Sequence, residues 1–163
     1  MTDNEERFNR MVSEYSEKLY WHVRSIVNCH EDADDIIQNV FLKVWRGLPL
    51  FRGESGEFTW LWRIATNEAL NFLRKEKLRS IFRDMDEASR ISSDPYFNGD
   101  EAELKLQTAI ASLPAKQRAV FCMRYYEELP YEQIAEITGT STGALKASYH
   151  IAQEKIKEKL NLL

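Results

Sequence analysis

The sequence predicts an all-α protein: two small helical domains joined by an acidic flexible linker, the second being a helix-turn-helix domain. Apolar residues recur at steps of three and four in several segments, as they do along one face of a helix. No run of alternating β-branched residues occurs, so we expect no strands. Residues 83–104 are rich in Asp, Glu and Ser without a sustained apolar period, which indicates a linker between domains at 1–82 and 105–163.

The composition is that of an ordinary soluble protein, with 44% hydrophobic and 29% charged residues. No run of about 18 apolar residues occurs, so we expect no direct membrane insertion. The polar, acidic beginning of the chain does not resemble a secretory signal. Cys29 and Cys122 are isolated, with no CxxC pair and no His at ligand spacing. They are expected to be reduced thiols in a cytoplasmic protein, and we expect no metal site.

Three helices are predicted before the linker, over about 5–28, about 31–46 and within 51–79. In the second, apolar residues alternate at steps of three and four, at Ala33, Ile36, Ile37, Val40, Phe41, Val44 and Trp45. The third follows the turn-rich segment 47–56, and its apolar face consists of Leu61, Ala65, Ala69, Phe72 and Leu73.

The remaining stripe of this third helix combines an aromatic ring, two guanidinium groups and two amides, at Trp60, Arg63, Asn67, Asn71 and Arg74. Such side chains stack on unpaired bases, bond their edges and neutralise phosphates. A structural Trp among ordinary surface polar residues is the alternative. For Trp60, packing against the preceding loop and contact with DNA both stay open.

About four helices are predicted after the linker, and Pro114 and Pro130 each mark a helix start because a first-turn residue needs no N–H. Within 130–160, a small Ala135, then Gly139 in the turn and an inward Leu145 have the spacing of a helix-turn-helix. Ser141 or Thr142 would cap its second helix.

That second helix is expected to bury one face, formed by Leu145, Tyr149, Ala152, Ile156 and Leu160. It would turn the opposite face outward toward the major groove, with Gly143, Lys146, Ala147, His150 and Glu154. A plain pair of antiparallel helices is the alternative.

Three segments resemble bacterial RNA polymerase sigma factors of the extracytoplasmic-function (ECF) type. They are DADDIIQNVFLKVW (32–45), FRGESGEFTWLWRIATNEALNFLR (51–74) and LPAKQRAVF…LPYEQIAEITGTSTGALKASYHIA (113–152). The resemblance covers nearly the whole chain. It implies an alternative sigma factor that binds core RNA polymerase and directs promoter-specific transcription initiation. The 1–82 domain would dock on the polymerase clamp and recognise and melt the −10 element, and the 105–163 domain would bind the −35 element.

The resemblance also implies site residues. Those for the −10 element are Arg52, Ser55, Phe58, Trp60, Arg63, Asn67, Asn71, Arg74 and Lys75. Those for the −35 element are Ser141, Thr142, Gly143, Lys146, Ala147 and His150. Those for the polymerase are Asp32, Asp35, Gln38, Asn39 and Leu42. The chain departs from the family at Asn39, where Glu is usual, and at Ser148, Ile151 and Gln153, where arginines are common.

The resemblance further implies three partners: core RNA polymerase, promoter DNA and an anti-sigma factor, which in this family is frequently membrane-bound. The net charge of −4 fits a protein that binds DNA weakly unless polymerase holds it. Residues 83–104, with seven acidic and two basic side chains, would occupy a basic channel of the polymerase.

Two other classes are considered: a stand-alone helix-turn-helix transcription regulator that binds duplex operators as a dimer, and an adaptor that does not contact DNA. The stripe from Trp60 to Arg74 and the lack of a dimerisation heptad argue against the regulator, and the helix-turn-helix spacing argues against the adaptor. We expect that the protein is not an enzyme and binds no cofactor, because no phosphate-binding Gly loop, HExxH motif or nucleophile elbow occurs in the sequence.

Overall fold

The structure is a computed structural model that describes residues 1–80, 87–94 and 97–162. Within these ranges the chain forms eight α-helices, one short 3-10 helix and no strand, which confirms the predicted all-α class. In chain order the elements are α1 (Asp3–Val27), α2 (His30–Gly47), η1 (Leu48–Leu50), α3 (Glu57–Ser80), α4 (Glu87–Ser93), α5 (Glu101–Ala111), α6 (Ala115–Tyr125), α7 (Tyr131–Thr138) and α8 (Thr142–Leu162).

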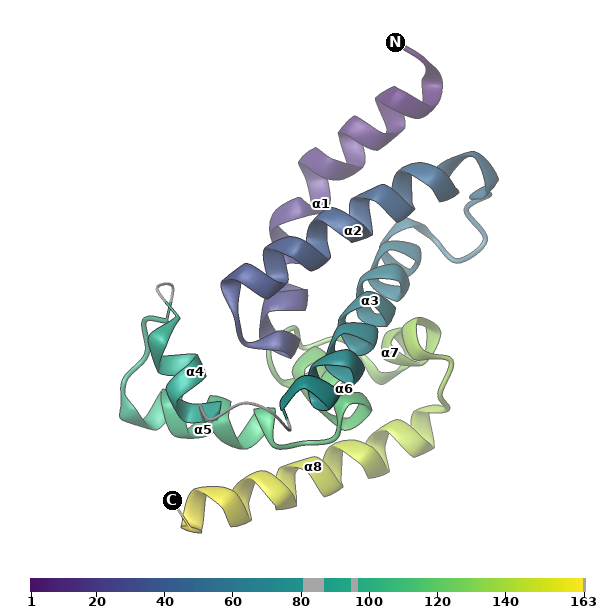
Figure 1. Cartoon of the computed structure of the whole chain (residues 1–163). Helices are drawn as coiled ribbons and strands as arrows, with labels where there is room; N and C mark the ends of the chain where they lie inside the picture. Colours follow the sequence, from purple (N-terminus) through teal and green to yellow (C-terminus); the bar gives the residue numbers. More distant parts are fainter. Residues whose placement is uncertain (81–86, 95–96, 163) are drawn as a thin grey trace.

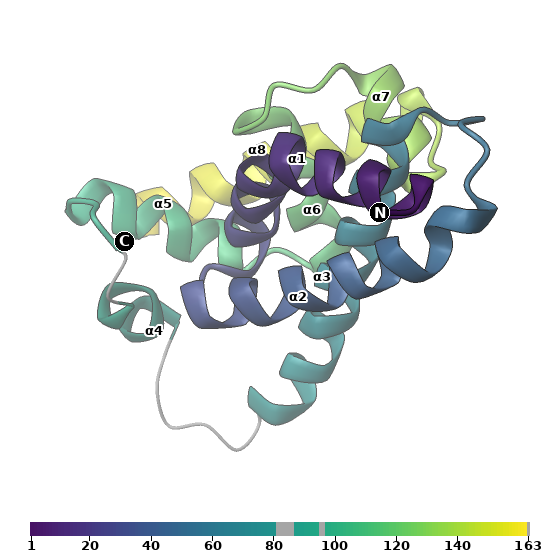
Figure 2. The same cartoon turned by 90° about the horizontal axis from the view of Figure 1, so that it is seen from above.

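The helices form two groups that pack against each other (Figures 1 and 2). In the first group, α1, α2 and α3 contact one another pairwise. In the second, α8 runs along α5, α6 and α7. The groups meet where α7 lies beside α3 and where α6 contacts both α1 and α3. The two ends of the chain lie at opposite ends of the molecule.

Local chemistry sets the ends of α1. The Thr2 hydroxyl accepts a hydrogen bond from the Glu5 amide at 3.1 Å, and the Glu5 carboxylate accepts one from the Thr2 amide at 3.4 Å. This capping box satisfies two amides that the helix itself leaves unpaired. At the other end, Asn28 adopts a left-handed conformation with φ 59° and stops the helix.

The predicted starts and ends of the C-terminal helices are confirmed. Pro114 and Pro130 directly precede α6 and α7 as their N-cap residues. Gly139 ends α7 with φ 73°, a conformation that a residue without Cβ adopts at no steric cost. The Ser141 hydroxyl accepts a hydrogen bond from the Ala144 amide at 3.2 Å, so Ser141 caps α8.

The acidic segment 83–104 differs from the extended linker that the sequence predicts. It contains α4, whose Ile91 is completely buried, and α4 packs against α5. Arg90 of α4 lies 3.1 Å from Glu87 and 3.7 Å from Asp32, which joins α4 to the start of α2. A helix of seven residues is too short to show a clear apolar period. Residues 83–86 and 95–96 lie outside the described residues.

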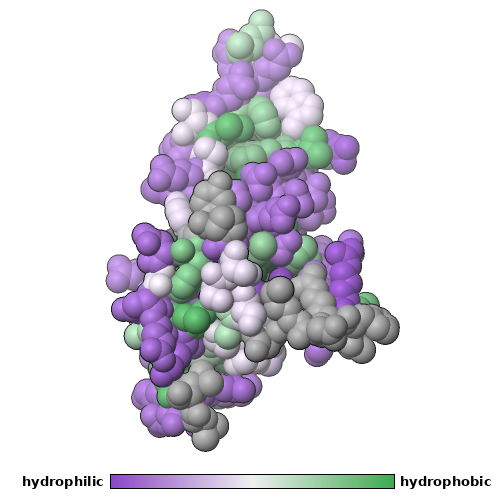
Figure 3. Space-filling view, turned by 60° about the vertical axis from the view of Figure 1, so that its left-hand side comes forward, coloured by the Kyte–Doolittle hydropathy of each residue, from purple (hydrophilic) through white to green (hydrophobic). Residues whose placement is uncertain are grey.

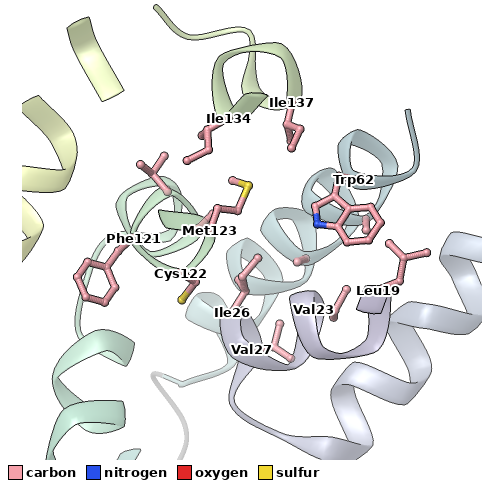
Figure 4. Close-up of a cluster of buried hydrophobic side chains, with 14 of the residues drawn as sticks. Leu19, Val23, Ile26, Val27, Trp62, Phe121, Cys122, Met123, Ile134 and Ile137 are labelled. Carbon is pink, nitrogen blue, oxygen red and sulfur yellow. The ribbon is translucent and has the colours of Figure 1, made fainter. Parts of the chain in front are cut away.

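One hydrophobic cluster spans both groups of helices (Figure 4). Ile26 of α1 and Trp62 of α3 face Met123 of α6 and Ile134 of α7, and all four are at most 1% exposed. Burying side chains of this size stabilises the fold by about 1.5–3 kcal/mol each. The apolar contact between the groups is therefore part of the core.

Candidate nucleic-acid interface

The loop between η1 and α3 folds around an aromatic pair. The rings of Phe51 and Trp60 stack with centroids 4.3 Å apart and planes at 12°. Gly47 approaches the same indole so closely that a Cβ on it would lie 3.1 Å from the ring. Trp60 thus packs against the loop, which is one of the two readings that the sequence leaves open.

Trp60 also lines a hollow of about 580 Å³ between this loop and the first turns of α3. Its walls combine aromatic, cationic and hydroxyl groups, from Gly47, Leu50, Phe51, Arg52, Glu54, Ser55, Trp60 and Arg63. Four predicted −10 residues, Arg52, Ser55, Trp60 and Arg63, are therefore brought together. Phe58 is not among them, since its ring stacks on Trp62 at 3.9 Å and faces the core.

The rest of the predicted stripe runs along α3. Asn67, Arg74 and Lys75 are exposed, and Asn71 is half-buried. The Arg74 guanidinium donates a hydrogen bond to the Asn71 side-chain carbonyl, so these two side chains hold each other. The exposed part of the stripe along α3 therefore consists of amides and cations.

Helix α7 covers part of this stripe. The Arg63 guanidinium donates two hydrogen bonds to the main-chain carbonyl of Glu136, from Nε at 3.2 Å and from Nη2 at 2.7 Å. The Thr59 hydroxyl donates to the Glu136 carboxylate at 3.3 Å. Arg63, one of the predicted −10 residues, is therefore bonded to α7 in this structure.

Glu127, in the turn after α6, joins three helices through its carboxylate. It accepts a hydrogen bond from the Trp62 indole N–H at 2.8 Å, and its other oxygen lies 2.6 Å from Nδ1 of His22. The second ring nitrogen of His22 lies 2.8 Å from the Thr66 hydroxyl. His22 is fully buried in this contact.

His30 is partly buried, and its Nδ1 lies 2.5 Å from the Tyr20 hydroxyl. The partners of both histidines come from other turns or helices; Glu127 is 105 positions away from His22 in sequence. No local pattern signals such pairs.

Two further side chains of α6 fix it to α1. The Cys122 thiol donates to the Ser25 carbonyl at 3.4 Å, and Arg118 donates to the Ile26 carbonyl at 3.3 Å. Complete burial raises the pKa of the Cys122 thiol to about 12, and burial lowers the pKa of Arg118. Both cysteines are free thiols, as predicted.

The outward face of α8 is open. Gly143, Lys146, Ala147 and His150 are exposed, and Thr142 is half-buried. The Lys146 ammonium lies 5.8 Å from the centre of the Tyr131 ring. On the opposite face, Leu145, Ala152 and Ile156 are buried as predicted, whereas Leu160 is 38% exposed because α8 extends beyond its neighbours.

The predicted polymerase-docking face of α2 is exposed at Asp35, Gln38, Asn39 and Leu42. It continues into a groove of about 730 Å³ between α1 and α2, lined by Glu5, Phe8, Asn9, Ile37, Gln38, Phe41, Leu42 and Trp45. Figure 3 shows apolar side chains at the surface among hydrophilic ones on this upper part of the molecule. Asp32 differs from the other predicted residues, since it is half-buried beside Arg90.

The part of the chain that the structure describes contains neither a metal site nor a membrane-spanning helix. No group of three or more His, Cys, Asp or Glu residues there is placed to hold a metal ion. No described helix is long and apolar enough to cross a bilayer.

Comparison with known proteins gives two family models in the order of the two groups of helices. Sigma-70 region 2 matches residues 11–79, and Sigma-70, region 4 matches residues 103–155. Together they define a transcription initiation factor of the sigma-70 class.

Curated relatives narrow this class. The ECF RNA polymerase sigma-E factor of Haemophilus influenzae is 30% identical over 96% of this chain and 88% of its own length. The sigma-E factor of Escherichia coli K12 is 31% identical over 98% of this chain and 90% of its own length. The chain belongs to the ECF RNA polymerase sigma factors, which direct promoter-specific initiation by RNA polymerase.

Two solved structures share the fold. The sigma factor RpoE of Bartonella quintana, in complex with the anti-sigma factor NepR, superposes with a TM-score of 0.74 at 23% identity. The match covers 95% of this chain and 97% of that one. CnrH in complex with the cytosolic domain of CnrY gives a TM-score of 0.70 at 19% identity, covering 98% of this chain and 91% of that one.

Proposed function

We propose that this sigma factor reads the −35 element with α8 and captures unpaired bases of the −10 element with α3 and the preceding loop. The observation that carries the proposal is the hollow beside α3. Its volume of about 580 Å³, its stacked aromatic wall and the polar rim of Arg52 and Ser55 suit a base that has left the duplex. Extracting a base costs a few kcal/mol, and stacking on an aromatic ring returns about 1–3 kcal/mol per base.

The proposal divides the chain into three functional parts. Residues 1–82 dock on the polymerase and melt the −10 element, and residues 105–163 bind the −35 element. Residues 83–104 connect the two and occupy a basic channel of the polymerase, for which the excess of acidic side chains is the support. Replacing these acids by Ser or Asn is expected to weaken assembly with core polymerase, and unchanged affinity would discard this role.

Docking on the polymerase is assigned to the exposed face of α2. Leu42 is 52% exposed beside the polar groups of Asp35, Gln38 and Asn39. An apolar side chain ringed by polar ones is typical of a protein interface. Asp32 would contribute from the edge of this face, where Arg90 holds it.

Reading the −10 strand requires α7 to leave α3, because Arg63 bonds to Glu136 in this arrangement. Polymerase would drive this opening by binding the two groups of helices at separate places. It would also align both DNA-reading surfaces, so that their contacts act together through effective concentration.

The test is in vitro transcription from fragmented genomic DNA with purified core RNA polymerase, with and without this protein. New transcripts that share two spaced upstream motifs are the expected result. No added transcripts, together with tight binding of the protein alone to symmetric duplex sites, would show a stand-alone regulator instead.

Capture of unpaired bases is tested with a matched pair of variants. Asn67→Ala removes an exposed amide from the stripe on α3 and is expected to reduce promoter opening about fivefold, the equivalent of one hydrogen bond. Opening is measured by permanganate reactivity of unpaired thymines. Asn161→Ala, an exposed amide at the end of α8, is the control and should leave opening unchanged. Equal effects of the two variants would remove Asn67 from the site.

We propose that an anti-sigma factor, either free or anchored in the membrane, is the inhibitory partner. Support comes from two solved structures of the same fold, one a complex with the anti-sigma factor NepR and the other a complex with the cytosolic domain of CnrY. A candidate should block transcription when added in equal amount before polymerase, and a candidate that blocks only after promoter opening would not fit this role.

A further inference from the structure

An apolar side chain stands at the rim of the hollow beside α3, among polar neighbours. Leu50 of η1 is 81% exposed, and among the described large apolar residues only Met1, at the start of the chain, is more exposed. The same rim carries charged and hydroxyl groups, from Arg52, Glu54 and Ser55. Single exposed leucines are common on protein surfaces, so exposure alone assigns no role to this one.

The backbone around Leu50 holds this side chain in a fixed place. Leu48, two positions earlier, is completely buried. Phe51, the next residue, stacks on Trp60, and its amide donates a hydrogen bond to the Leu48 carbonyl at 3.2 Å. Pro49 restricts φ in the first turn of η1. Leu50 is therefore an apolar group mounted on a rigid turn between two anchored neighbours.

The segment that carries Leu50 lies at the edge of the molecule. The connection between α2 and α3 projects on the opposite side from α4 and α5 in both views (Figures 1 and 2). Within it, η1 contacts α1 and α2, while Leu50 stays exposed and lines the hollow. A strand of DNA that places a base in the hollow would therefore pass directly over Leu50.

The chemistry of leucine limits what it contacts on DNA. Its side chain neither donates nor accepts hydrogen bonds, so it binds no phosphate and bonds to no base edge. The contacts that remain are with thymine methyl groups and with the flat faces of bases. Stacking hides these faces in an intact duplex, but they become accessible next to a base that has left the stack. Apolar side chains such as leucine enter between base steps in this way and unstack them.

We propose that Leu50 acts as a wedge in strand opening, entering the base stack at the place from which a −10 base moves into the hollow. The inference rests on the proposed capture of that base by α3 and the preceding loop. Leu50 fills the vacated place, so the extruded base does not return to it. It also buries its own exposed apolar surface against the neighbouring bases, which favours the open strand. Leu50 is thus a positioning residue for opening and does not select the base.

The test compares Leu50→Gln with Leu50→Met in the holoenzyme formed with core polymerase. The two replacement side chains have similar length and flexibility, but only that of Met is apolar. Under conditions in which the wild type opens about half of an intact promoter, Leu50→Gln should lower the equilibrium constant for opening about tenfold, and Leu50→Met should stay within about twofold. Permanganate reactivity of unpaired thymines measures the opening. A tenfold loss in both variants, or in neither, would overturn the proposal.

A promoter whose −10 segment is already unpaired by mismatches separates wedging from other contacts. The mismatches remove the step that Leu50 assists, so the affinity of the Leu50→Gln holoenzyme for this promoter should equal that of the wild type. Asn67→Ala, which alters the capturing surface, should bind it about fivefold more weakly. An equal loss of Leu50→Gln on the mismatched and intact promoters would show that Leu50 contacts the captured strand itself, and would overturn the wedge.

The same pair of variants distinguishes failure of the wedge from failure of base capture. If Leu50→Gln opened the intact promoter like the wild type while Asn67→Ala remained impaired, the wedge would be wrong and capture by α3 would stand. If Asn67→Ala had no effect on either promoter, the capture on which the wedge depends would be wrong as well.

Leu78→Gln is the control for the loss of an exposed leucine. Leu78 is 69% exposed and lies at the opposite end of α3 from the hollow, so its variant should open the intact promoter like the wild type. An equal loss in Leu78→Gln and Leu50→Gln would show a general apolar contribution and overturn the wedge. Because both leucines are exposed, the free variants should melt at the temperature of the wild type, which separates the effect on opening from a loss of folding.

Discussion

The two predicted DNA-reading helices, α3 and α8, differ in what covers them. On α3, Arg63 is bonded to the main chain of α7, and Asn71 and Arg74 bond to each other. On α8, Lys146 and His150 face outward from the rest of the molecule. The residue types on both helices suit nucleic acid, so the difference between them arises from the neighbouring helix.

Under the proposed function, the closed molecule, in which α7 lies against α3, leaves the proposed −35 surface open and covers part of the proposed −10 surface. When only a fraction of molecules has the binding-competent arrangement, the apparent affinity falls by that fraction. The contact between α7 and α3 would therefore weaken binding of single-stranded DNA by the free protein while leaving duplex binding by α8 unchanged. Substitutions on either side of this contact should change the difference between α3 and α8.

The largest effect is expected from Glu127→Leu, which removes the acceptor of both His22 and Trp62. These buried donors would lose their partner in the closed arrangement but meet water in the open one, so opening becomes easier by about 2–4 kcal/mol. The measurement is the alkylation rate of Cys122, followed by mass spectrometry, which should rise at least about 30-fold.

Glu132→Leu is the matched control, since this exposed residue on α7 loses the same charge without a buried partner. Its alkylation rate should equal that of the wild type. If Glu127→Leu also left the rate unchanged, the carboxylate of Glu127 would not hold the two groups of helices together.

Alkaline pH should open the same contact. Burial raises the pKa of the Cys122 thiol to about 12 from an ordinary value of 9.0, so between these values the opened or unfolded protein releases a proton that the closed one keeps. Stability is therefore fully present below pH 9.0 and falls above it by about 1.4 kcal/mol per pH unit. Urea denaturation at about pH 8, 9 and 10 measures the slope.

Cys122→Ala is expected to lower stability at neutral pH, because it leaves a small cavity, but to reduce this slope. The part that remains is expected from Cys29, because burial raises the pKa of its thiol as well. The comparison is made below about pH 10 because burial also raises the pKa of the Tyr126 hydroxyl. An unchanged slope in Cys122→Ala would assign the alkaline loss to another group.

In the exposed helix α8, Ser141→Ala removes the hydroxyl that caps the first turn. The loss is expected to cost about 1 kcal/mol of stability, measured by urea denaturation. Ser141→Gly should cost only a few tenths of that amount, since Gly is itself a tolerated cap. Equal stability of Ser141→Ala and wild type would mean that the cap does not determine where α8 starts.

The smallest effect is expected from Lys146→Ala. It removes one cation from the outward face of α8. The slope of the logarithm of the duplex binding constant against the logarithm of the salt concentration should therefore become less steep by about 0.9. Lys157→Ala removes the same charge from the exposed far end of α8 and should leave the slope unchanged. The measurement is binding of a promoter duplex by the holoenzyme over a range of salt concentrations. A slope lowered equally by both variants would mean that α8 lies along the DNA over its full length.

The sequence predicts features that depend on neighbouring residues. The period of α2 identifies Ala33, Ile36, Val40 and Val44, and all are buried. The glycine at 139 marks the turn of the helix-turn-helix, where φ is positive. The apolar period and the residue preferences of turns are local properties, so they can be predicted before the fold is known.

The sequence does not predict features that depend on packing between distant parts. Trp62 belongs to neither predicted face of α3, yet it is 1% exposed because α3 is covered by helices on more than one side. A single-face pattern fails for such a helix. The pairing of His22 with Glu127 and the packing of α4 on α5 likewise arise from contacts that no local period encodes.

Arg63 holds α7 against α3 through a main-chain carbonyl and not through a side chain. Every amino acid at position 136 supplies the same carbonyl, so the bond is inherited with the backbone of α7. Substitution of Glu136 can remove only its side-chain contact with Thr59. A genetic selection for constitutively open variants should therefore recover changes at Arg63 far more often than changes at Glu136.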